Sequence, residues 1–369
     1  MYHNPVKVIE TNNWREECRK IQEKLRIHNP LIITSNSNLK RQKLSTVFNS
    51  NSILSNVKPN PTFDSCQKEI DYCNTLRFDG VIAIGGGSVM DTAKVVMASI
   101  GTGIVDVARL LTVTTPYENR VPSIFIPTTH GTGSEVTMWA TVWDMEEKKK
   151  YSLSHPDLYP DMAVLDGTLT LSLPLHISLS TTLDALSHSF EAIWNKNANP
   201  KSTDYAIEAI CLILANIERL KEESQNIEMR NTLLKASNIA GLAISNTKTA
   251  AAHSISYPLT IMYGIPHGVA CSLSLLPLLH INKVAVEKEL KLIITKLGMD
   301  SFSELENRMN QIFDDILKFN LKSWGVNRSD LPILVEQSFT KGRIDNNIVQ
   351  ITRSDIHDIL NFMYEYPNE

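Results

Sequence analysis

One stretch of the sequence decides the fold: VIAIGGGSVMDTAK, residues 81–94. The four apolar residues at its start are typical of a buried strand, and Val89 and Ala93 recur at the spacing of a helix. Gly86 and Gly87 stand between the two, where small residues let backbone amides approach an anion at the positive end of a helix. The stretch therefore predicts a strand, a phosphate-binding turn and a helix.

The same turn also has a simpler interpretation. Ser88 and Asp91 have the Ser-x-x-Asp spacing of a capping box, which closes the start of a helix without any ligand. The stretch also lacks the G-x-G-x-x-G spacing of the Rossmann fingerprint. If the turn binds a dinucleotide, we expect the contacts to come from Gly86, Gly87, Ser88 and Asp91.

Short apolar runs rich in Ile and Val recur on both sides of this stretch, separated by helical patterns and turns. They predict further strands at Leu31–Thr34, Ser123–Ile126 and Met162–Leu165. Such runs, alternating with helices, are typical of a largely parallel sheet that is covered on both faces. We expect residues 1–173 to form an α/β, Rossmann-like domain that binds a dinucleotide.

From residue 174 onward the strand signals fade and amphipathic helical patterns follow one another. They predict helices at 181–194, 205–221, 229–245, 284–297 and 303–319. Pro174 separates the two patterns and marks the expected domain boundary. We expect residues 174–369 to form an all-α domain that binds a metal and the substrate.

A second polar loop, Thr128–Glu135, follows the strand that ends at Ile126. Loops at the carboxyl ends of parallel strands converge, and open α/β sheets bind their ligands there. We expect the loop to contact the diphosphate or the ribose of a dinucleotide through Thr128, Thr129, Thr132 and Ser134. A connection capped by hydroxyl groups, with no ligand, also explains these residues.

Four side chains of the second half have the types and spacing of a metal site. Asp184 and His188 lie four residues apart in a predicted helix and so share one face. Pro258, Gly264 and Pro266 lie between His253 and His267, so we expect the helix that carries His253 to break and the chain to return at His267. Three imidazoles and a carboxylate suit Fe²⁺ or Zn²⁺ better than Mg²⁺ or Ca²⁺. A surface ion pair and isolated core histidines are the alternative.

The composition limits the possible function classes. A net charge of −4 and a pI near 6.2 provide no basic field for nucleic acid. Five scattered cysteines without a C-x-x-C pair indicate neither a disulfide framework nor a thiolate zinc site, and favour a reducing cytoplasm. No signal-peptide pattern or long apolar run predicts contact with a membrane. A small-molecule substrate and a homo-oligomer, by default a homodimer, are the expected partners.

Together these motifs resemble the group III, iron-containing alcohol dehydrogenases. The resemblance rests on residues 81–94, on the loop from Pro127 to Glu135 and on the Asp/His/His/His set in its order and spacing, and it covers nearly the whole chain. It implies a metal-dependent, NAD- or NADP-linked alcohol dehydrogenase or aldehyde reductase. The implied ligands of the Fe²⁺ or Zn²⁺ ion are Asp184, His188, His253 and His267.

Within that family the chain is most similar to the hydroxyethylphosphonate dehydrogenases, which reduce phosphonoacetaldehyde. The similarity lies in residues 149–161, 194–200 and 247–258. It implies a phosphonate substrate, for which Lys248 is the first candidate contact, with Asn195 and Lys150 as others. On an unbroken helix, however, Lys248 lies about 140° around the axis from His253, which leaves an exposed or structural role open.

Three residues depart from the family pattern. Many members have a second histidine four residues after the first late ligand, on the nicotinamide side, where this chain has Tyr257. His130 replaces a small residue of the second loop, so we expect a proton relay through Tyr257 or His130. Ser35 stands where some members carry the acidic residue that selects NAD, which leaves room for the 2′-phosphate of NADP.

Three other functions fit part of the pattern. An iron-type dehydrogenase that acts on an uncharged alcohol or aldehyde is the nearest alternative to a phosphonate enzyme. Cyclases resembling dehydroquinate synthase share the two-domain plan, but the Asp184-x-x-x-His188 spacing differs from their carboxylate pattern. A noncatalytic nucleotide sensor has no need of the four metal ligands that this chain retains.

Overall fold

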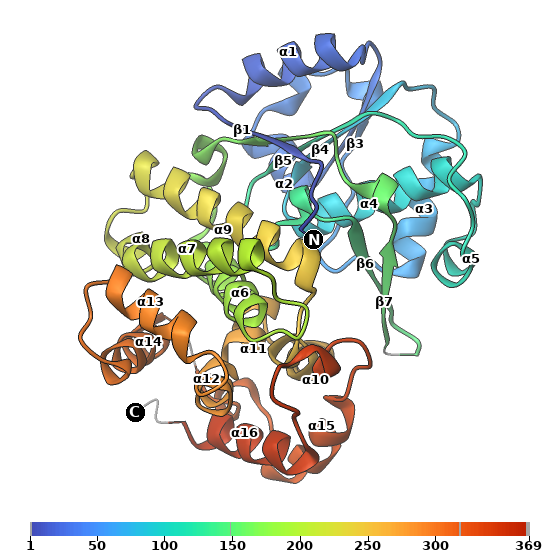
Figure 1. The fold of residues 1–369 in the computed structure, drawn as a ribbon. Coiled ribbons are helices and arrows are strands. Elements are labelled where there is room, and N and C mark those ends of the chain that lie inside the picture. The colour runs from blue at the N-terminus through green and yellow to red at the C-terminus, as the bar shows by residue number, and fades with distance from the viewer. Residues whose placement is uncertain (1, 148, 317–318, 367–369) are drawn as a thin grey trace. The chain divides into compact units, whose positions relative to one another are not determined.

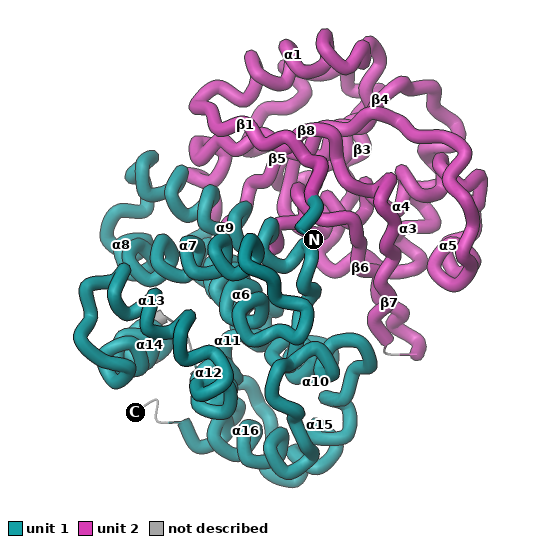
Figure 2. Tube along the Cα trace, in the orientation of Figure 1, with its two compact units in different colours: residues 1–3, 174–369 teal, residues 4–173 magenta. Residues whose placement is uncertain are grey.

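The computed structural model describes residues 2–147, 149–316 and 319–366. The chain divides into two compact units (Figure 2). Unit 1 comprises Met1–His3 and Pro174–Glu369, and unit 2 comprises Asn4–Leu173. Unit 2 combines strands with helices, whereas the described part of unit 1 is helical (Figure 1), so the expected fold class is confirmed.

Unit 2 is built on a parallel sheet, which has six strands within the described residues. The strands are β1 (Lys7–Glu10), β2 (Pro30–Thr34), β3 (Ile53–Leu54), β4 (Gly80–Gly85), β5 (Ser123–Pro127) and β8 (Met162–Leu165). Their order across the sheet is β1-β8-β5-β4-β2-β3, and each neighbouring pair is parallel. Because β3 lies on one side of β2 and β4 on the other, the winding reverses between β2 and β4. Doubly wound sheets bind their ligands at this switch point.

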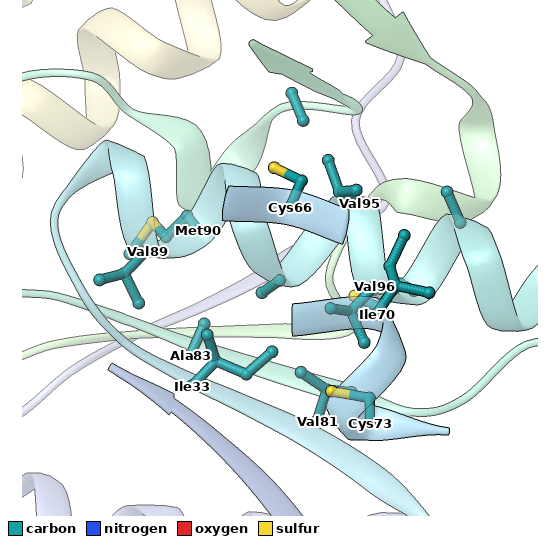
Figure 3. Close-up of a cluster of buried hydrophobic side chains, with 14 of the residues drawn as sticks. Ile33, Cys66, Ile70, Cys73, Val81, Ala83, Val89, Met90, Val95 and Val96 are labelled. Atoms are coloured by element: carbon teal, nitrogen blue, oxygen red, sulfur yellow. The ribbon is translucent and has the colours of Figure 1, made fainter. Parts of the chain in front are cut away.

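Both faces of the sheet are covered by helices. Those helices are α1 (Trp14–Leu25), α2 (Asn36–Arg41), α3 (Phe63–Cys73), α4 (Gly87–Thr102) and α5 (Val107–Thr112). On one face Ile33 packs with Cys66 of α3 and Val96 of α4 (Figure 3). Ile32, the neighbour of Ile33, packs on the opposite face with α1. A sheet buried on both faces needs apolar residues at every position, which explains the uninterrupted apolar runs.

A two-stranded antiparallel hairpin, β6 (Trp139–Asp144) and β7 (Lys149–Ser154), completes unit 2. The sequence analysis did not predict it. Ala140 and Val142 of β6 are buried in the core that also contains α3 and α4, while Thr141 between them is less buried. This alternation of apolar and polar residues is visible in the sequence, but it is too short to identify a strand by itself.

Unit 1 consists of packed helices. The longer ones are α6 (Leu175–Ile193), α7 (Pro200–Asn216), α9 (Ile227–Thr247), α10 (Ala251–Tyr263), α14 (Phe302–Ile316) and α16 (Arg353–Glu365). The shorter ones are α8 (Arg219–Glu222), α11 (His267–Ser272), α12 (Leu275–Asn282), α13 (Glu287–Lys296) and α15 (Leu331–Gln337). Helix α6 is in contact with α7, α9, α10 and α11 and is buried along most of its length. It is therefore the central helix of this unit.

The helix that carries His253 ends before His267, as expected. Pro258 lies inside α10, because a single proline removes only one donor of the helix, and the helix ends at Gly264, whose φ of +66° suits a left-handed cap. The segment before His253, however, is not one unbroken helix, since α9 ends at Thr247 and Lys248 follows at a φ of 65° and a ψ of 176°. The angle of 140° between Lys248 and His253 therefore does not apply.

Two general properties also bear on the class of the protein. Among the described residues, no single helix is long and apolar enough to cross a membrane. One pair, His267–Asn282 with Glu287–Lys296, meets the length and composition criteria only jointly and is bent by 119°. All five cysteines are free thiols, and all but Cys211 are buried.

Candidate metal centre and nucleotide-binding loops

Helix α6 places three ionisable side chains on one buried face. Asp184, His188 and Glu191 lie one and two turns apart along it. Their exposed fractions are 3%, 5% and 0%. Ionisable groups are rarely buried this completely unless they are paired or bind a metal. This face is therefore the base of the candidate site.

Two further helices of unit 1 bring imidazoles to this face. Helix α10 carries His253 in its first turn, and α11 begins with His267. Gly268 follows, and a Cβ atom at that position would lie 1.9 Å from the backbone oxygen of Ser180. Only glycine therefore permits the close approach of α11 to α6 that sets the position of His267.

The four residues expected to bind a metal come together around one oxygen atom. Asp184 Oδ1 lies 3.8 Å from His188 Nε2, 3.6 Å from His253 Nε2 and 3.9 Å from His267 Nε2. Among the described residues, neither Asp184 Oδ1 nor His253 Nε2 has a hydrogen-bond partner. Two donors bound to one tetrahedral ion at about 2.1 Å stand about 3.4 Å apart, close to these separations. The residues present thus fit a divalent metal ion.

The charge state of Asp184 suits this role. Burial raises the pKa of its carboxyl, but the surrounding imidazoles outweigh burial and hold that pKa well below its ordinary value. The carboxylate is therefore ionised at neutral pH, which is the form that binds a metal. The His267 side chain is 29% exposed, in contrast to its buried partners, so the cluster is open on that side.

Glu191 fixes His253 from behind. Its Oε2 lies 2.5 Å from His253 Nδ1, and its Oε1 accepts a 3.0 Å hydrogen bond from the His253 backbone N–H. Burial raises the pKa of Glu191, but its contacts with His253 lower that pKa on balance. Because Nδ1 is held by a carboxylate, Nε2 is left for the metal. Glu191 was not predicted from the sequence, although its position seven residues after Asp184 places it on the same helical face.

A thiol lies beside the imidazoles. Cys271 of α11 is fully buried, and its Sγ lies 3.7 Å from His267 Nε2. The donor atoms of Asp184, His253, His267 and Cys271 all lie within 4.8 Å of one another. The sequence analysis set the cysteines aside because they form no C-x-x-C pair. The spacing of four residues between His267 and Cys271 was the available signal that the thiol lies near this cluster.

Of the residues expected to act on the substrate, Tyr257 lies at this cluster. Its ring is nearly parallel to that of His267, with 6.3 Å between centroids and 11° between planes. Lys248 is exposed, and its backbone oxygen accepts a 3.1 Å hydrogen bond from Asn195 Nδ2. Asn195 also accepts a hydrogen bond from the Asn197 N–H, so both ends of its amide hold the local chain. These two bonds give Asn195 a structural role, and its contact with the substrate stays a prediction.

In unit 2, the two glycine-containing loops meet at the carboxyl edge of the sheet. They follow the neighbouring strands β4 and β5. A Cβ atom on Gly86 would lie 3.1 Å from Thr129 Cγ2, and one on Gly87 would lie 2.5 Å from Thr132 Cγ2. Glycine at these positions therefore lets the second loop close against the N-terminus of α4.

Ser88 and Asp91 do not form the capping box that their spacing suggests. Helix α4 begins before Ser88, whose hydroxyl accepts a 3.1 Å hydrogen bond from the Asn60 N–H. The Asp91 carboxylate binds the second loop and the hairpin instead, accepting from Ser134 Oγ at 2.9 Å and from the Thr141 N–H at 3.1 Å. Asp91 thus ties the first loop and its helix to the second loop.

Lys94 holds the same loop from within the core. Its Nζ lies 2.7 and 2.9 Å from the backbone oxygens of Ser134 and Trp139, and 2.9 and 3.0 Å from the hydroxyl oxygens of Ser134 and Thr137. Burial lowers the pKa of Lys94 to about 8, against the attraction of Asp91. Ser134 Oγ thus contacts both Asp91 and Lys94 and holds the loop in place.

The other expected contacts of unit 2 lie around the same edge. Ser35 caps α2 directly after β2 and accepts a 3.3 Å hydrogen bond from the Asn38 N–H. The side-chain amide of Asn38 donates to Thr128 Oγ1 at 3.3 Å, which links the segments after β2 and β5 across the switch point. His130 is fully buried in the second loop. Lys150 lies on β7, with its Nζ over the ring of a tryptophan of β6.

Comparison with known proteins relates both units to one family. Residues 5–167 match the family described as iron-containing alcohol dehydrogenase, and residues 178–364 match the C-terminal part of the Fe-containing alcohol dehydrogenase family. The chain belongs to the iron-containing alcohol dehydrogenase family. The resemblance inferred from the sequence is thereby confirmed, and the family's name agrees with a cluster of one carboxylate and three imidazoles.

Individual members of the family show different specificities. Long-chain-alcohol dehydrogenase 1 of Geobacillus thermodenitrificans is 33% identical over 258 residues, 69% of this chain and 65% of that protein. Phosphonoacetaldehyde reductase of Streptomyces viridochromogenes is 35% identical over 229 residues, 60% of this chain and 58% of that protein. The matched segments thus span less than two thirds of these two relatives. Among solved structures, sulfoacetaldehyde reductase from Bifidobacterium kashiwanohense in complex with NAD+ is 27% identical in sequence. Its superposition covers 100% of this chain and 99% of the reductase chain, with a TM-score of 0.91.

Proposed function

We propose that this chain reduces phosphonoacetaldehyde to 2-hydroxyethylphosphonate, with NADH or NADPH as the hydride donor. The observation that carries the reductase chemistry is the buried cluster of Asp184 with three imidazoles. The relatives named for phosphonoacetaldehyde and sulfoacetaldehyde support the substrate class. Both names describe a two-carbon aldehyde that carries a strongly acidic group, so a short anionic aldehyde is the shared chemistry.

The residues of unit 1 hold the reacting end of the substrate. Asp184, His188, His253 and His267 are the proposed ligands, and the Glu191 carboxylate keeps the ring of His253 in the orientation that binding requires. A divalent metal at this place supplies Lewis-acid polarisation of a carbonyl group. The exposed side of His267 is where we expect the aldehyde to enter.

A proton must also reach the oxygen of the product. Tyr257 lies beside His267, and its phenol group is a hydrogen-bond donor. We assign it the first position of a relay that ends in solvent water. His130, which is fully buried in the second loop, is the alternative to Tyr257 in this role.

The loops of unit 2 are the proposed dinucleotide site. The N-terminus of α4, with Gly86 and Gly87, provides backbone amides and a positive helix end for the diphosphate. Thr129 and Thr132 border these glycines and supply hydroxyl groups. Ser35 adds no negative charge after β2, so we expect both NADH and NADPH to be accepted.

The test is a comparison of kcat/KM for phosphonoacetaldehyde, sulfoacetaldehyde and propanal, each with NADH and with NADPH. We expect phosphonoacetaldehyde to be preferred over propanal, because only the anionic aldehydes gain charge-assisted hydrogen bonds. A preference for propanal would overturn the anionic substrate and leave a dehydrogenase for uncharged alcohols. A preference for sulfoacetaldehyde would keep the anion but replace the phosphonate.

Lys248 is the proposed contact for the phosphonate group. It is exposed, and Asn195 holds its backbone. We expect Lys248→Ala to lower kcat/KM for phosphonoacetaldehyde roughly 10- to 100-fold, since a hydrogen bond to a charged group contributes about 1.5–3 kcal/mol. Activity on propanal should change little. Lys291→Ala, on the exposed face of α13, is the matched control and should leave both activities unchanged.

A further inference from the structure

The link between α9 and α10 contains a backbone conformation that residues with a side chain rarely adopt. Lys248 directly follows α9 and has a φ of 65° and a ψ of 176°. Arg26 and Lys43 also have a positive φ, but their ψ values of 39° and 44° place them in the ordinary left-handed region. The conformation of Lys248 is occupied almost only by glycine, so it persists only where the surrounding structure enforces it.

Three asparagine side chains enforce this conformation. The backbone oxygens of three consecutive residues each accept a hydrogen bond from a different side-chain amide. The pairs are Thr247 O with Asn197 Nδ2 at 3.3 Å, Lys248 O with Asn195 Nδ2 at 3.1 Å, and Thr249 O with Asn346 Nδ2 at 2.8 Å. The first two pairs hold the peptide groups on both sides of Lys248, so a change of its backbone angles would break these bonds. We call the three asparagines the asparagine clamp.

The two segments that carry the clamp are also joined to each other. The Asn346 backbone oxygen accepts a 2.8 Å hydrogen bond from the Lys196 N–H. Asn195 is 1% exposed, and its Oδ1 accepts a 2.9 Å hydrogen bond from the Asn197 N–H. The amide groups of the clamp are therefore held in place independently of the link.

A lysine at this position indicates a use for its side chain, because glycine would adopt the same backbone without strain. The Lys248 side chain is exposed. Helix α10 begins three residues later and carries His253 in its first turn. The conformation of the link therefore sets the direction of the Lys248 side chain relative to the metal cluster, and all of these residues belong to unit 1.

We propose that Asn195, Asn197 and Asn346 are positioning residues, which hold Lys248 ready for the acidic group of the substrate and so determine the preference for anionic aldehydes. The proposal rests on the proposed function, in which Lys248 contacts the phosphonate. A fixed backbone narrows the region that the ammonium group can reach, so less conformational freedom is lost when it binds an anion. In this role the clamp acts through Lys248.

The first test measures the strain without any substrate. Lys248→Gly and Lys248→Ala both remove the ammonium group, but only glycine relieves the backbone. At equal urea concentrations, we expect the folded-to-unfolded ratio of Lys248→Gly to exceed that of Lys248→Ala at least about fivefold. At Lys291 of α13, where glycine disfavours the helix, the same pair of substitutions should show the opposite order. Equal stability of the two Lys248 variants would overturn the clamped, strained conformation.

The second test measures selectivity. Asn346→Ala should lower the ratio of kcat/KM for phosphonoacetaldehyde to kcat/KM for propanal at least about fivefold, through a higher KM for the phosphonate. In a Lys248→Ala background the same substitution should leave this ratio unchanged, because the clamp acts through Lys248. Asn216→Ala, which removes an amide that donates to a backbone oxygen of α7 at 2.9 Å, is the control and should keep the ratio.

The outcomes separate this proposal from the proposed function. If Lys248→Ala lowers the ratio and neither Asn346→Ala nor Asn197→Ala does so, the contact with the phosphonate stands and the clamp has no positioning role. An equal effect of Asn346→Ala with and without Lys248 would also overturn the positioning role, since the loss would then be structural. If Lys248→Ala itself leaves the ratio unchanged, the contact with the phosphonate fails, and the positioning role fails with it.

Discussion

At the scale of single residues, the orientation of His253 depends on a group that binds no metal itself. Glu191 contacts both Nδ1 and the backbone N–H of His253, and all of these atoms are buried. A carboxylate that accepts from the second ring nitrogen fixes the tautomer and the orientation of a metal-binding imidazole. Five residues therefore build the site, four of which were predicted from the spacing of the sequence and its resemblance to a known family.

Substitution of Glu191 should weaken metal binding. We expect Glu191→Ala to lower the affinity for Zn²⁺ roughly 10- to 100-fold, as measured by competition with a chelator. Glu191→Gln keeps an acceptor for His253 Nδ1, so its affinity for Zn²⁺ should fall less than that of Glu191→Ala. Glu208→Gln, at an exposed position of α7, is the control. Unchanged affinity in Glu191→Ala would show that His253 keeps its orientation without the carboxylate.

The buried thiol of Cys66 should make stability depend on alkaline pH. Burial raises the pKa of Cys66 from an ordinary value of 9.0 to about 12. A raised pKa in the folded state means that the folded chain keeps a proton that the unfolded chain loses. The contribution of Cys66 to the free energy of unfolding is therefore complete below pH 9 and is lost between pH 9 and 12.

This dependence can be isolated by difference. We expect the loss of unfolding free energy in Cys66→Ala to shrink by about 1.4 kcal/mol between pH 8 and pH 10, as measured by urea denaturation. Val96→Ala removes buried apolar surface from the same core without a titratable group, and its loss should stay constant. Parallel behaviour of the two variants would contradict the raised pKa.

At the scale of elements, the packing of α11 on α6 depends on one glycine. A Cβ atom on Gly268 meets the backbone oxygen of Ser180 at 1.9 Å, and backbone cannot rotate away as a side chain can. The helices must separate to admit even a methyl group. Because Asp184 lies on α6 and His267 on α11, their separation also widens the metal centre.

Gly268→Ala should therefore reduce both stability and metal affinity. We expect a loss of unfolding free energy of about 3 kcal/mol or more, at the upper end of the range for overpacked sites. Gly264→Ala is the matched control, because that glycine has a φ of +66° and no atom within 4 Å of an added Cβ. Gly264→Ala should lower the free energy of unfolding by about 1 kcal/mol through backbone strain alone, and it should leave the metal affinity unchanged. Equal effects of the two substitutions would refute the steric explanation.

At the scale of the whole molecule, metal binding should stabilise one unit more than the other. The proposed ligands all belong to unit 1, on α6, α10 and α11. A ligand that binds only the folded state at 100 times its Kd stabilises that state by about 2.7 kcal/mol. Removal of the metal should therefore loosen these helices first.

Hydrogen exchange before and after chelation measures this effect. We expect faster exchange in α6, α10 and α11 of the chelated protein, and little change in β4, β5 and α4 of unit 2. Restoration of Zn²⁺ should restore the protection. Protection changes that are equal in the two units, or confined to unit 2, would place the bound metal elsewhere.

The sequence by itself determined the features that repeat over short distances. Strands buried on both faces must be apolar at every position, so the four main strands were identified within two residues of their bounds. The spacing of Asp184 and His188 placed them on one helical face. The resemblance of the motifs to one family then supplied the remaining ligands, and the fold brought all four to a single oxygen atom.

Only the tertiary structure decided which further groups lie beside the two candidate sites. Glu191 and Cys271 have no sequence signal beyond their helical register, and their contacts with His253 and His267 arise from the packing of α6, α10 and α11. The spacing of Asp91 likewise suggested a capping box at the start of a helix, but its carboxylate accepts a hydrogen bond from Ser134. These contacts join residues far apart in the chain, where periodicity carries no information and close packing selects the neighbours.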